Sequence, residues 1–186
     1  MDEIYIQRIL DGDSEAYRFL ILKYRDMAYS IAMSVIKNEF DAEEILQVSF
    51  AKAFNNLDSF KRNSKFSTWL YRIVINESFK SLKKQKAEII DFKETPPDFS
   101  IDILNPILKL EEEDQKFYLN EALKQMPAKE CLILRLFYLE ENSIEEVREI
   151  TGWSVSDIKV TLYRARIRLK QILTEVFKLD KKALYK

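Results

Sequence analysis

The chain has 186 residues, of which 47% are hydrophobic and 33% are charged, and its formal net charge is -1. It contains no His and a single Cys, which excludes a zinc site built from Cys and His, a His-based catalytic triad and an internal disulfide. With only 2 Gly and 4 Pro, the composition predicts an all-α protein with enough apolar residues for a core, and neither an enzyme nor a cofactor or metal site is expected.

The first expected elements are two helices over residues 3–37, broken at "DGDS". Asp13 is a suitable N-cap for the second helix. The N-terminal stretch "MDEIYIQRILDGD" is charged and holds no long apolar run, so neither a signal peptide nor a transmembrane span is predicted. We therefore expect a cytoplasmic protein.

The next two expected helices are separated by the polar loop "KRNSKF". The first is "DAEEILQVSFAKAFNNL", whose Asp41 and Glu44 form a cap-like D-x-x-E start. The second is the long helix "TWLYRIVINESFKSLKKQK", with Ser67 as its cap. On a helical wheel its apolar residues fill one half, and the other half carries Trp69, Arg72, Asn76, Lys80 and Lys83.

This stripe on the long helix combines an aromatic ring, an amide and cations. Stacking, base-edge hydrogen bonds and phosphate contacts with single-stranded nucleic acid need these groups. The alternative is that Trp69 packs against a neighbouring element and that the lysines are merely solvated.

An acidic segment with Pro96, Pro97 and Pro106 follows, and its composition predicts a linker over residues 87–114. Two domains result, over residues 1–86 and 115–180. The charge is unevenly distributed, because residues 61–86 hold eight basic and one acidic side chain, and residues 159–186 hold nine and two. Two basic blocks in an acidic body suit a polyanionic partner, although solvated helix ends would give the same pattern.

The second domain is expected to begin with a helix that ends at Gln125, followed by a helix starting at Pro127. Cys131 lies in the apolar stretch "KECLILRLF", where a buried, inert thiol is expected. Ser143 and Glu146 then form a capping box, and Gly152 ends that helix. Another helix starts near Ser154 and Asp157, which predicts a helix-turn-helix whose second helix enters the DNA major groove.

Four motifs follow one another along the chain: "DGDSEAYRFLILKY", "DAEEILQVSFAKAF", "FSTWLYRIVIN" and "SVSDIKVTLYRARIRL". In this order they resemble the conserved motifs of the extracytoplasmic-function class of bacterial sigma factors, over nearly the whole chain. Each motif is weak alone, but four in family order, with an acidic linker between, are specific. The resemblance implies two small helical domains that bind core RNA polymerase and read the −10 and −35 promoter elements.

The resemblance also implies partners and site residues. The partners are the clamp helices of the largest polymerase subunit, the flap of the second-largest subunit, promoter DNA and an anti-sigma factor that could hold the protein at the membrane. The implied polymerase-binding residues are Asp41, Glu44, Gln47 and Phe50. For the −10 element they are Lys61, Arg62, Lys65, Phe66, Ser67, Trp69, Arg72, Asn76, Lys80 and Lys83. For the −35 element they are Ser154, Ser156, Asp157, Lys159, Thr161, Tyr163, Arg164 and Arg166.

Some positions depart from the family pattern. Val48 replaces a usual acid, Ile75 and Lys80 replace a common Arg and Asp, and Val160 and Thr161 replace a usual Ser-Arg. Arg148 replaces a small residue and must direct its charge outward. Two other functions stay open on the residues alone: a helix-turn-helix regulator, which leaves the Trp69 stripe unexplained, and a helical adaptor that binds no nucleic acid.

Overall fold

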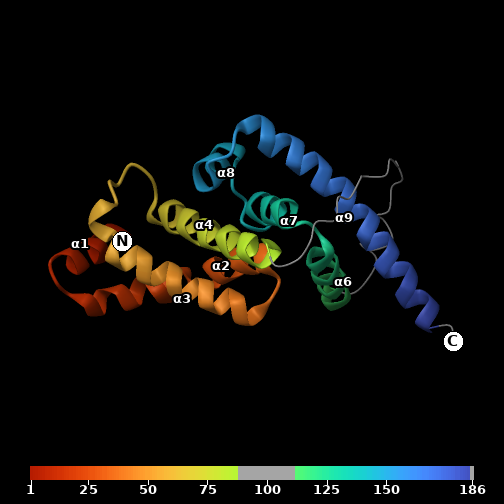
Figure 1. Cartoon of the computed structure of the whole chain (residues 1–186), viewed down its shortest axis with the longest axis horizontal. Coiled ribbons are helices and arrows are strands. Elements are labelled where there is room, and N and C mark those ends of the chain that lie inside the picture. The colour runs from red at the N-terminus through yellow and green to blue at the C-terminus, as the bar shows by residue number, and fades with distance from the viewer. Residues whose placement is uncertain (88–111, 185–186) are drawn as a thin grey trace.

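The computed structural model describes residues 1–87 and 112–184, which are helical and contain no strand, as the composition predicts. The first half comprises α1 (Asp2–Leu10), the short 3-10 turn η1 (Ser14–Ala16), α2 (Tyr17–Ile36), α3 (Glu39–Asn55), the 3-10 turn η2 (Leu57–Ser59) and α4 (Phe66–Ala87). The second half comprises α6 (Glu112–Gln125), α7 (Ala128–Leu134), a π-helical turn η3 (Arg135–Leu139), α8 (Ile144–Thr151) and α9 (Val155–Leu184) (Figure 1). Most of the predicted linker, residues 88–111, lies outside the described residues.

The helix starts in the first half confirm one predicted cap and correct two. The Asp13 carboxylate accepts a hydrogen bond from the backbone N–H of Ala16 at 3.3 Å, at the turn that leads into α2. At α3, Asn38 is the cap, because its extended backbone aims its side-chain oxygen at the N–H of Asp41. The helix thus begins two residues before Asp41. Ser67 lies inside the first turn of α4, since α4 begins at Phe66.

In the first half, α2, α3 and α4 pack around a common core. Leu20, Leu70 and Val74 are completely buried in it. The Tyr17 hydroxyl donates to the backbone carbonyl of Phe50 at 2.5 Å, which joins α2 to α3. At the N-terminus, the Tyr24 hydroxyl donates to Asp2 and thereby holds α1 against α2.

In the second half, the predicted helix-turn-helix is present in α8 and α9. Both halves of the capping box form, because the Ser143 side chain accepts from the Glu146 N–H and the Glu146 carboxylate accepts from the Ser143 N–H at 3.0 Å. Gly152 ends α8 with φ 74°, a left-handed conformation that glycine adopts without the steric cost of a Cβ. The Ser154 hydroxyl accepts from the Asp157 N–H at 3.1 Å and so starts α9.

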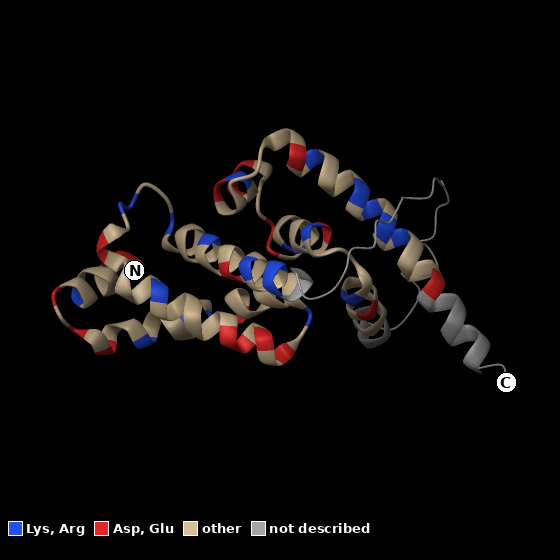
Figure 2. Cartoon of the chain, in the orientation of Figure 1, with Lys and Arg blue, Asp and Glu red and all other residues tan. Residues whose placement is uncertain are grey.

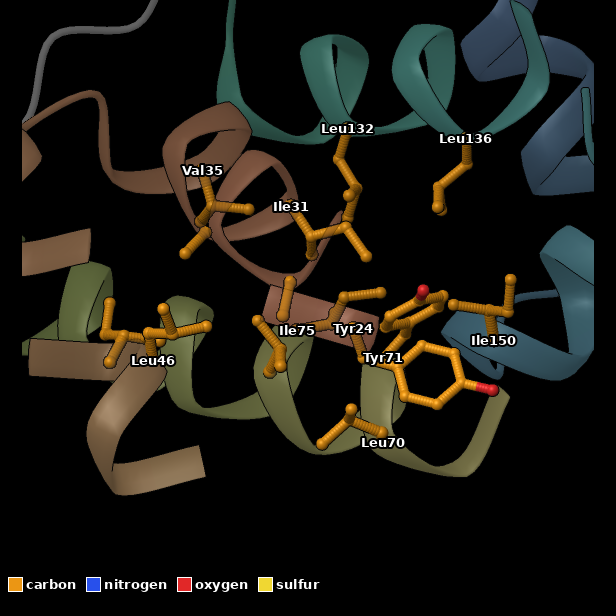
Figure 3. Packing of buried hydrophobic residues seen from close by; sticks show 14 of the residues in the cluster. Tyr24, Ile31, Val35, Leu46, Leu70, Tyr71, Ile75, Leu132, Leu136 and Ile150 are labelled. Atoms are coloured by element: carbon orange, nitrogen blue, oxygen red, sulfur yellow. The ribbon is translucent and has the colours of Figure 1, made fainter. Parts of the chain in front are cut away.

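The two halves share one hydrophobic core. Figure 3 shows Ile31 of α2 facing Leu132 of α7, with Val35 further along α2, and Tyr71 of α4 lying near Ile150 of α8. All five side chains are buried, and burial of one large apolar side chain contributes about 1.5–3 kcal/mol. The arrangement of the halves, which their sequence leaves open, is therefore set by apolar packing of α7 on α2 and of α8 on α4.

Candidate nucleic-acid and polymerase interfaces

The stripe predicted on α4 is formed as expected. The residues of its apolar half are buried, among them Leu70, Val74 and Ile75. The opposite face presents polar and basic side chains that remain open to solvent, namely Arg72, Asn76, Lys80 and Lys83. Blue segments along α4 in Figure 2 mark these cations.

Trp69 packs against its neighbours, as one of the two interpretations of the sequence expected, and it also stays partly open to solvent. Its ring packs against Phe60 and Phe66, with centroid separations of 5.4 and 5.7 Å, yet the side chain stays half-buried rather than enclosed. Phe66 itself is only 3% exposed. Its predicted direct contact with DNA is therefore not available in this arrangement, and Phe66 instead supports the ring of Trp69 from behind.

The loop before α4 contributes further cations. Lys61, Arg62 and Lys65 are exposed, and Ser67 is half-buried just after them. Arg62 has a positive φ of 57° and donates to the Gln7 side-chain oxygen at 2.8 Å, which ties the loop to α1. The basic loop thus leads directly into the α4 stripe, at the N-terminal end of that helix.

On α3, Glu44 and Gln47 are exposed and Asp41 is half-buried, so these three can meet a partner. Phe50 is 6% exposed and packs edge-on against Tyr17, which makes it a core residue and not a surface contact. The periodicity of the helix did not reveal this, because an aromatic side chain suits either place.

A groove of about 550 Å³ lies between α3 and α4. Its lining includes the acids Asp41 and Glu44 with Val48 from α3, and the cations Lys80 and Lys83 from α4. Residues assigned by sequence to two different partners therefore line one groove. Sequence reasoning missed this, because these side chains are brought together only by the packing of α3 on α4.

The face of α9 predicted for duplex DNA is largely exposed. Its exposed members are Ser154, Ser156, Asp157, Lys159, Tyr163, Arg164 and Arg166. Thr161 is the exception: it is 9% exposed and lies on the inner side of α9, so it packs rather than meeting a groove of DNA. The Arg166 side chain donates to the Tyr138 hydroxyl at 2.5 Å, and Arg148 turns outward to pair with Glu145 at 2.7 Å, as expected.

The sequence did not indicate a contact between α8 and α4. Lys65 pairs with the Glu146 carboxylate at 3.0 Å, and Arg72 donates to the backbone carbonyl of Glu149 at 2.7 Å. The hydrogen bond from Lys65, together with those from Ser143, lowers the pKa of Glu146 to about 2. The capping-box pattern singled out Glu146, but only as a cap.

Other chemistry is sparse in the part of the chain that is described. Cys131 is buried, as predicted, and burial raises the pKa of its thiol. Among the described residues, no group of three or more His, Cys, Asp or Glu side chains is placed to hold a metal ion. None of the described helices is both long enough and apolar enough to cross a membrane.

An all-α chain that joins a helix with an aromatic and basic stripe to a helix-turn-helix defines a class of DNA-binding proteins, and comparison with known proteins specifies it further. The family model for sigma-70 region 2 matches residues 20–88, and that for sigma-70 region 4 matches residues 116–169. The chain belongs to the extracytoplasmic-function sigma factors of the sigma-70 family, and it directs promoter-specific transcription initiation.

Individual relatives agree with this family. The chain is 31% identical over 157 residues to the RNA polymerase sigma factor SigV of Bacillus subtilis, covering 83% of this chain and 89% of SigV. It is 28% identical over 179 residues to the ECF sigma factor SigW of the same organism, covering 92% and 96%. Among solved structures, the sigma factor RpoE in complex with the anti-sigma factor NepR from Bartonella quintana shares the fold, with a TM-score of 0.61 at 24% identity over 85% of this chain and 96% of that one. CnrH in complex with the cytosolic domain of CnrY gives a TM-score of 0.59 at 19% identity, over 94% and 97%.

Proposed function

We propose that this sigma factor divides its work among three surfaces: α3 for the polymerase clamp, α4 with the loop before it for the −10 element, and α9 for the −35 element. The observation that carries the proposal is the α4 stripe. The outer side of α4 presents an amide and a row of cations beside the half-buried Trp69. The opposite side of the same helix is packed in the core. Such a surface suits unpaired bases and their phosphates.

On α4, each type of side chain has a distinct task. Trp69, supported by Phe66, offers a rigid ring against which a base of the melted strand can stack. Asn76 reads a base edge, and Arg72, Lys80 and Lys83 hold the strand by its phosphates. The cations of the preceding loop, Lys61, Arg62 and Lys65, extend this track with Ser67.

On α3, the exposed Glu44 and Gln47 together with Asp41 form a polar and acidic patch for the clamp helices of the largest subunit. Phe50 supports this patch from the core. Near Gln47 and Phe50 lies a second groove, of about 580 Å³, whose lining is mostly apolar side chains of α2 and α3. This groove would let the clamp contact extend beyond the charged patch.

In the second half, α9 offers its exposed polar face to duplex DNA, with Lys159, Arg164 and Arg166 for phosphates and bases. An apolar groove of about 460 Å³ between α6, α7 and α9 is the proposed seat for the polymerase flap. Its lining includes Leu123, Leu139 and Leu173. An apolar lining suits an apolar segment of the flap, whereas a DNA-binding groove would need a positively charged lining.

An anti-sigma factor is the further proposed partner, because the sigma factor RpoE, which shares this fold, has been solved in complex with the anti-sigma factor NepR. CnrH, which also shares the fold, has been solved in complex with the cytosolic domain of CnrY. By the same analogy, we place this chain in the cytoplasm, where an anti-sigma factor could hold it at the membrane.

Run-off transcription tests the proposal. Purified core RNA polymerase, genomic DNA fragments and this protein are combined, and the 5′ ends of the transcripts are sequenced. We expect discrete new start sites that share two upstream elements. An absence of new starts, together with failure of the protein to co-elute with core polymerase, would contradict the proposal.

A further inference from the structure

Val160 is an apolar side chain in the middle of the polar face that α9 is proposed to offer to duplex DNA. It is 46% exposed. At about 100° per residue it points away from the core, because it stands two positions from both Ile158 and Leu162, which are buried. Ser156 and Arg164, which lie one turn before and one turn after it, are exposed and polar. Packing of the core therefore does not account for a valine at this position.

Helix formation does not account for Val160 either. Val forms helices less readily than Ala, Lys or Glu, because its β-branched side chain loses rotamer freedom in a helix. The same stiffness is an advantage in recognition. A helical Val holds one χ1 rotamer about 90% of the time, so its two methyl groups keep a fixed direction and lose little conformational entropy on binding.

The surroundings of Val160 indicate which ligand its methyl groups would meet. It lies within the first two turns of α9, the part of the second helix that a helix-turn-helix directs at base edges in the major groove. Cations are spread along α9 (Figure 2), and two of them, Lys159 and Arg164, are exposed close to Val160. A polyanion suits these cations better than an apolar protein surface does. In the major groove, the C5 methyl of thymine is the apolar group that base edges present.

We propose that Val160 is a specificity-determining residue, which contacts the C5 methyl group of a thymine in the −35 element. The inference rests on the proposed role of α9 in binding duplex DNA. Ser156 and Arg164 would hold the neighbouring bases or phosphates by hydrogen bonds, and Val160 would favour thymine by removing its methyl group from water. Burial of one methyl group changes a binding constant about fourfold.

Replacement of thymine by deoxyuridine tests this inference, because deoxyuridine pairs with adenine as thymine does and lacks only the C5 methyl. A promoter found by run-off transcription is synthesised with each thymine of the −35 element, on either strand, replaced in turn. Binding of the holoenzyme, formed from the full chain and core polymerase, is measured for each duplex by fluorescence anisotropy. The readout is the ratio of the affinities for the thymine and deoxyuridine duplexes, in which general changes of affinity cancel.

A matched pair of variants assigns the effect to one side chain. Val160→Ala shortens an exposed side chain and adds no hydrogen bond, so it removes the contact without creating another. Val48→Ala makes the same change at a valine that is 37% exposed and lies in the groove between α3 and α4. For one thymine, we expect deoxyuridine to weaken binding about threefold to fivefold in the unchanged chain and in Val48→Ala. In Val160→Ala the two duplexes should bind almost equally.

Three results would overturn the inference: a −35 element without thymine, no effect of deoxyuridine in the unchanged chain, or an effect of the same size in Val160→Ala. Each of these leaves the start sites of the unchanged chain in place, and so leaves the proposed function intact. Absence of new start sites with the unchanged chain instead rejects the proposed function, and the inference with it.

Discussion

At the residue scale, Trp69 illustrates how one side chain can serve a core and a surface together. Its ring rests on Phe60 and Phe66, so its orientation is restricted before any ligand arrives. A pre-oriented ring loses little conformational entropy when a base stacks on it. The aromatic cluster behind Trp69 therefore contributes to binding without touching DNA.

Replacement of Trp69 by Ala should impair promoter opening. Loss of one base-stacking contact costs about 1–3 kcal/mol, so we expect roughly a fivefold to hundredfold loss of open complexes. Permanganate footprinting of the holoenzyme on a promoter found by run-off transcription measures this. Trp69→Tyr, which retains a ring, should keep most of the signal, and circular dichroism of both variants checks their folding. Equal footprints for the Ala and Tyr variants would contradict the stacking role.

The Lys65–Glu146 pair should also make stability depend on pH. The pKa of Glu146 is lowered to about 2 in the folded chain from 4.5, mainly by its hydrogen bond from Lys65. A carboxyl whose pKa is depressed by folding stabilises the protein fully above its unfolded pKa, and this contribution is lost as pH falls through the folded value. The affected window is therefore pH 4.5 down to about 2.

Urea unfolding at about pH 6 and about pH 3.5 tests this pH dependence in the unchanged chain and in Glu146→Gln. The difference in free energy of unfolding between the two proteins should shrink at the lower pH. At about pH 3.5 the Glu146 carboxyl is protonated in the unfolded chain but still ionised in the folded chain, and this proton uptake stabilises the unfolded state of the unchanged chain only. A difference that stays constant or grows would show that Glu146 is not held ionised by its partners.

At the element scale, the turn between α8 and α9 depends on the backbone of Gly152. Its φ of 74° is unfavourable for residues with a Cβ, although the nearest side-chain atom to an added Cβ would be Arg72 Nη2 at 3.9 Å. There is therefore space for a methyl group, and the cost of a substitution is conformational. The sequence alone predicted this turn, because the signals that define it are local.

Gly152→Ala should lower the free energy of unfolding by about 1 kcal/mol, through strain at positive φ. Gly152→Asn should cost less, since Asn tolerates the left-handed region better than Ala. Chemical denaturation of the three proteins, followed by circular dichroism, gives the comparison. An Ala variant as stable as the unchanged chain would mean that the turn relaxes to another conformation.

At the scale of the whole molecule, the shared core makes the two halves interdependent. Leu132 of α7 is fully buried and faces Ile31 of α2 (Figure 3). Trp69 lies in the first half and Trp153 in the second, and they are the 2 Trp residues of the chain. Each half thus carries its own fluorescent reporter once the other Trp is replaced by Phe.

Leu132→Ala should cost about 2–5 kcal/mol by leaving a cavity between α7 and α2. With Leu132 intact, we expect the unfolding curves reported by Trp69 and Trp153 to coincide. In the Leu132→Ala variant the coupling between the halves weakens, so the two curves should separate.

Leu173→Ala is the matched control for this experiment. Leu173 belongs to a small separate cluster with Tyr118 and Ala122, so its replacement should leave the coupling between the halves intact. Coincident curves in Leu132→Ala would argue against coupling through the contact of α7 with α2.

The amino-acid sequence by itself determined the features that depend on local spacing. These are the all-α class, the polar and apolar faces of α4, the capping box at Ser143 and the left-handed turn at Gly152, because each arises from interactions within a few residues. The resemblance to sigma factors, carried by four motifs in order, was confirmed by the family comparisons.

Only the tertiary structure decided which side chains are available and which elements meet. Phe50, Phe66 and Thr161 match a motif or a helix face, but their burial depends on neighbouring helices. The seating of α8 on α4 results from apolar packing between distant segments of the chain. Arg72 and Glu149, which are joined by a hydrogen bond across this contact, are 77 positions apart in the sequence. Contacts of this kind leave no periodic pattern in either segment, so the contact between α8 and α4 could be found only from the folded molecule.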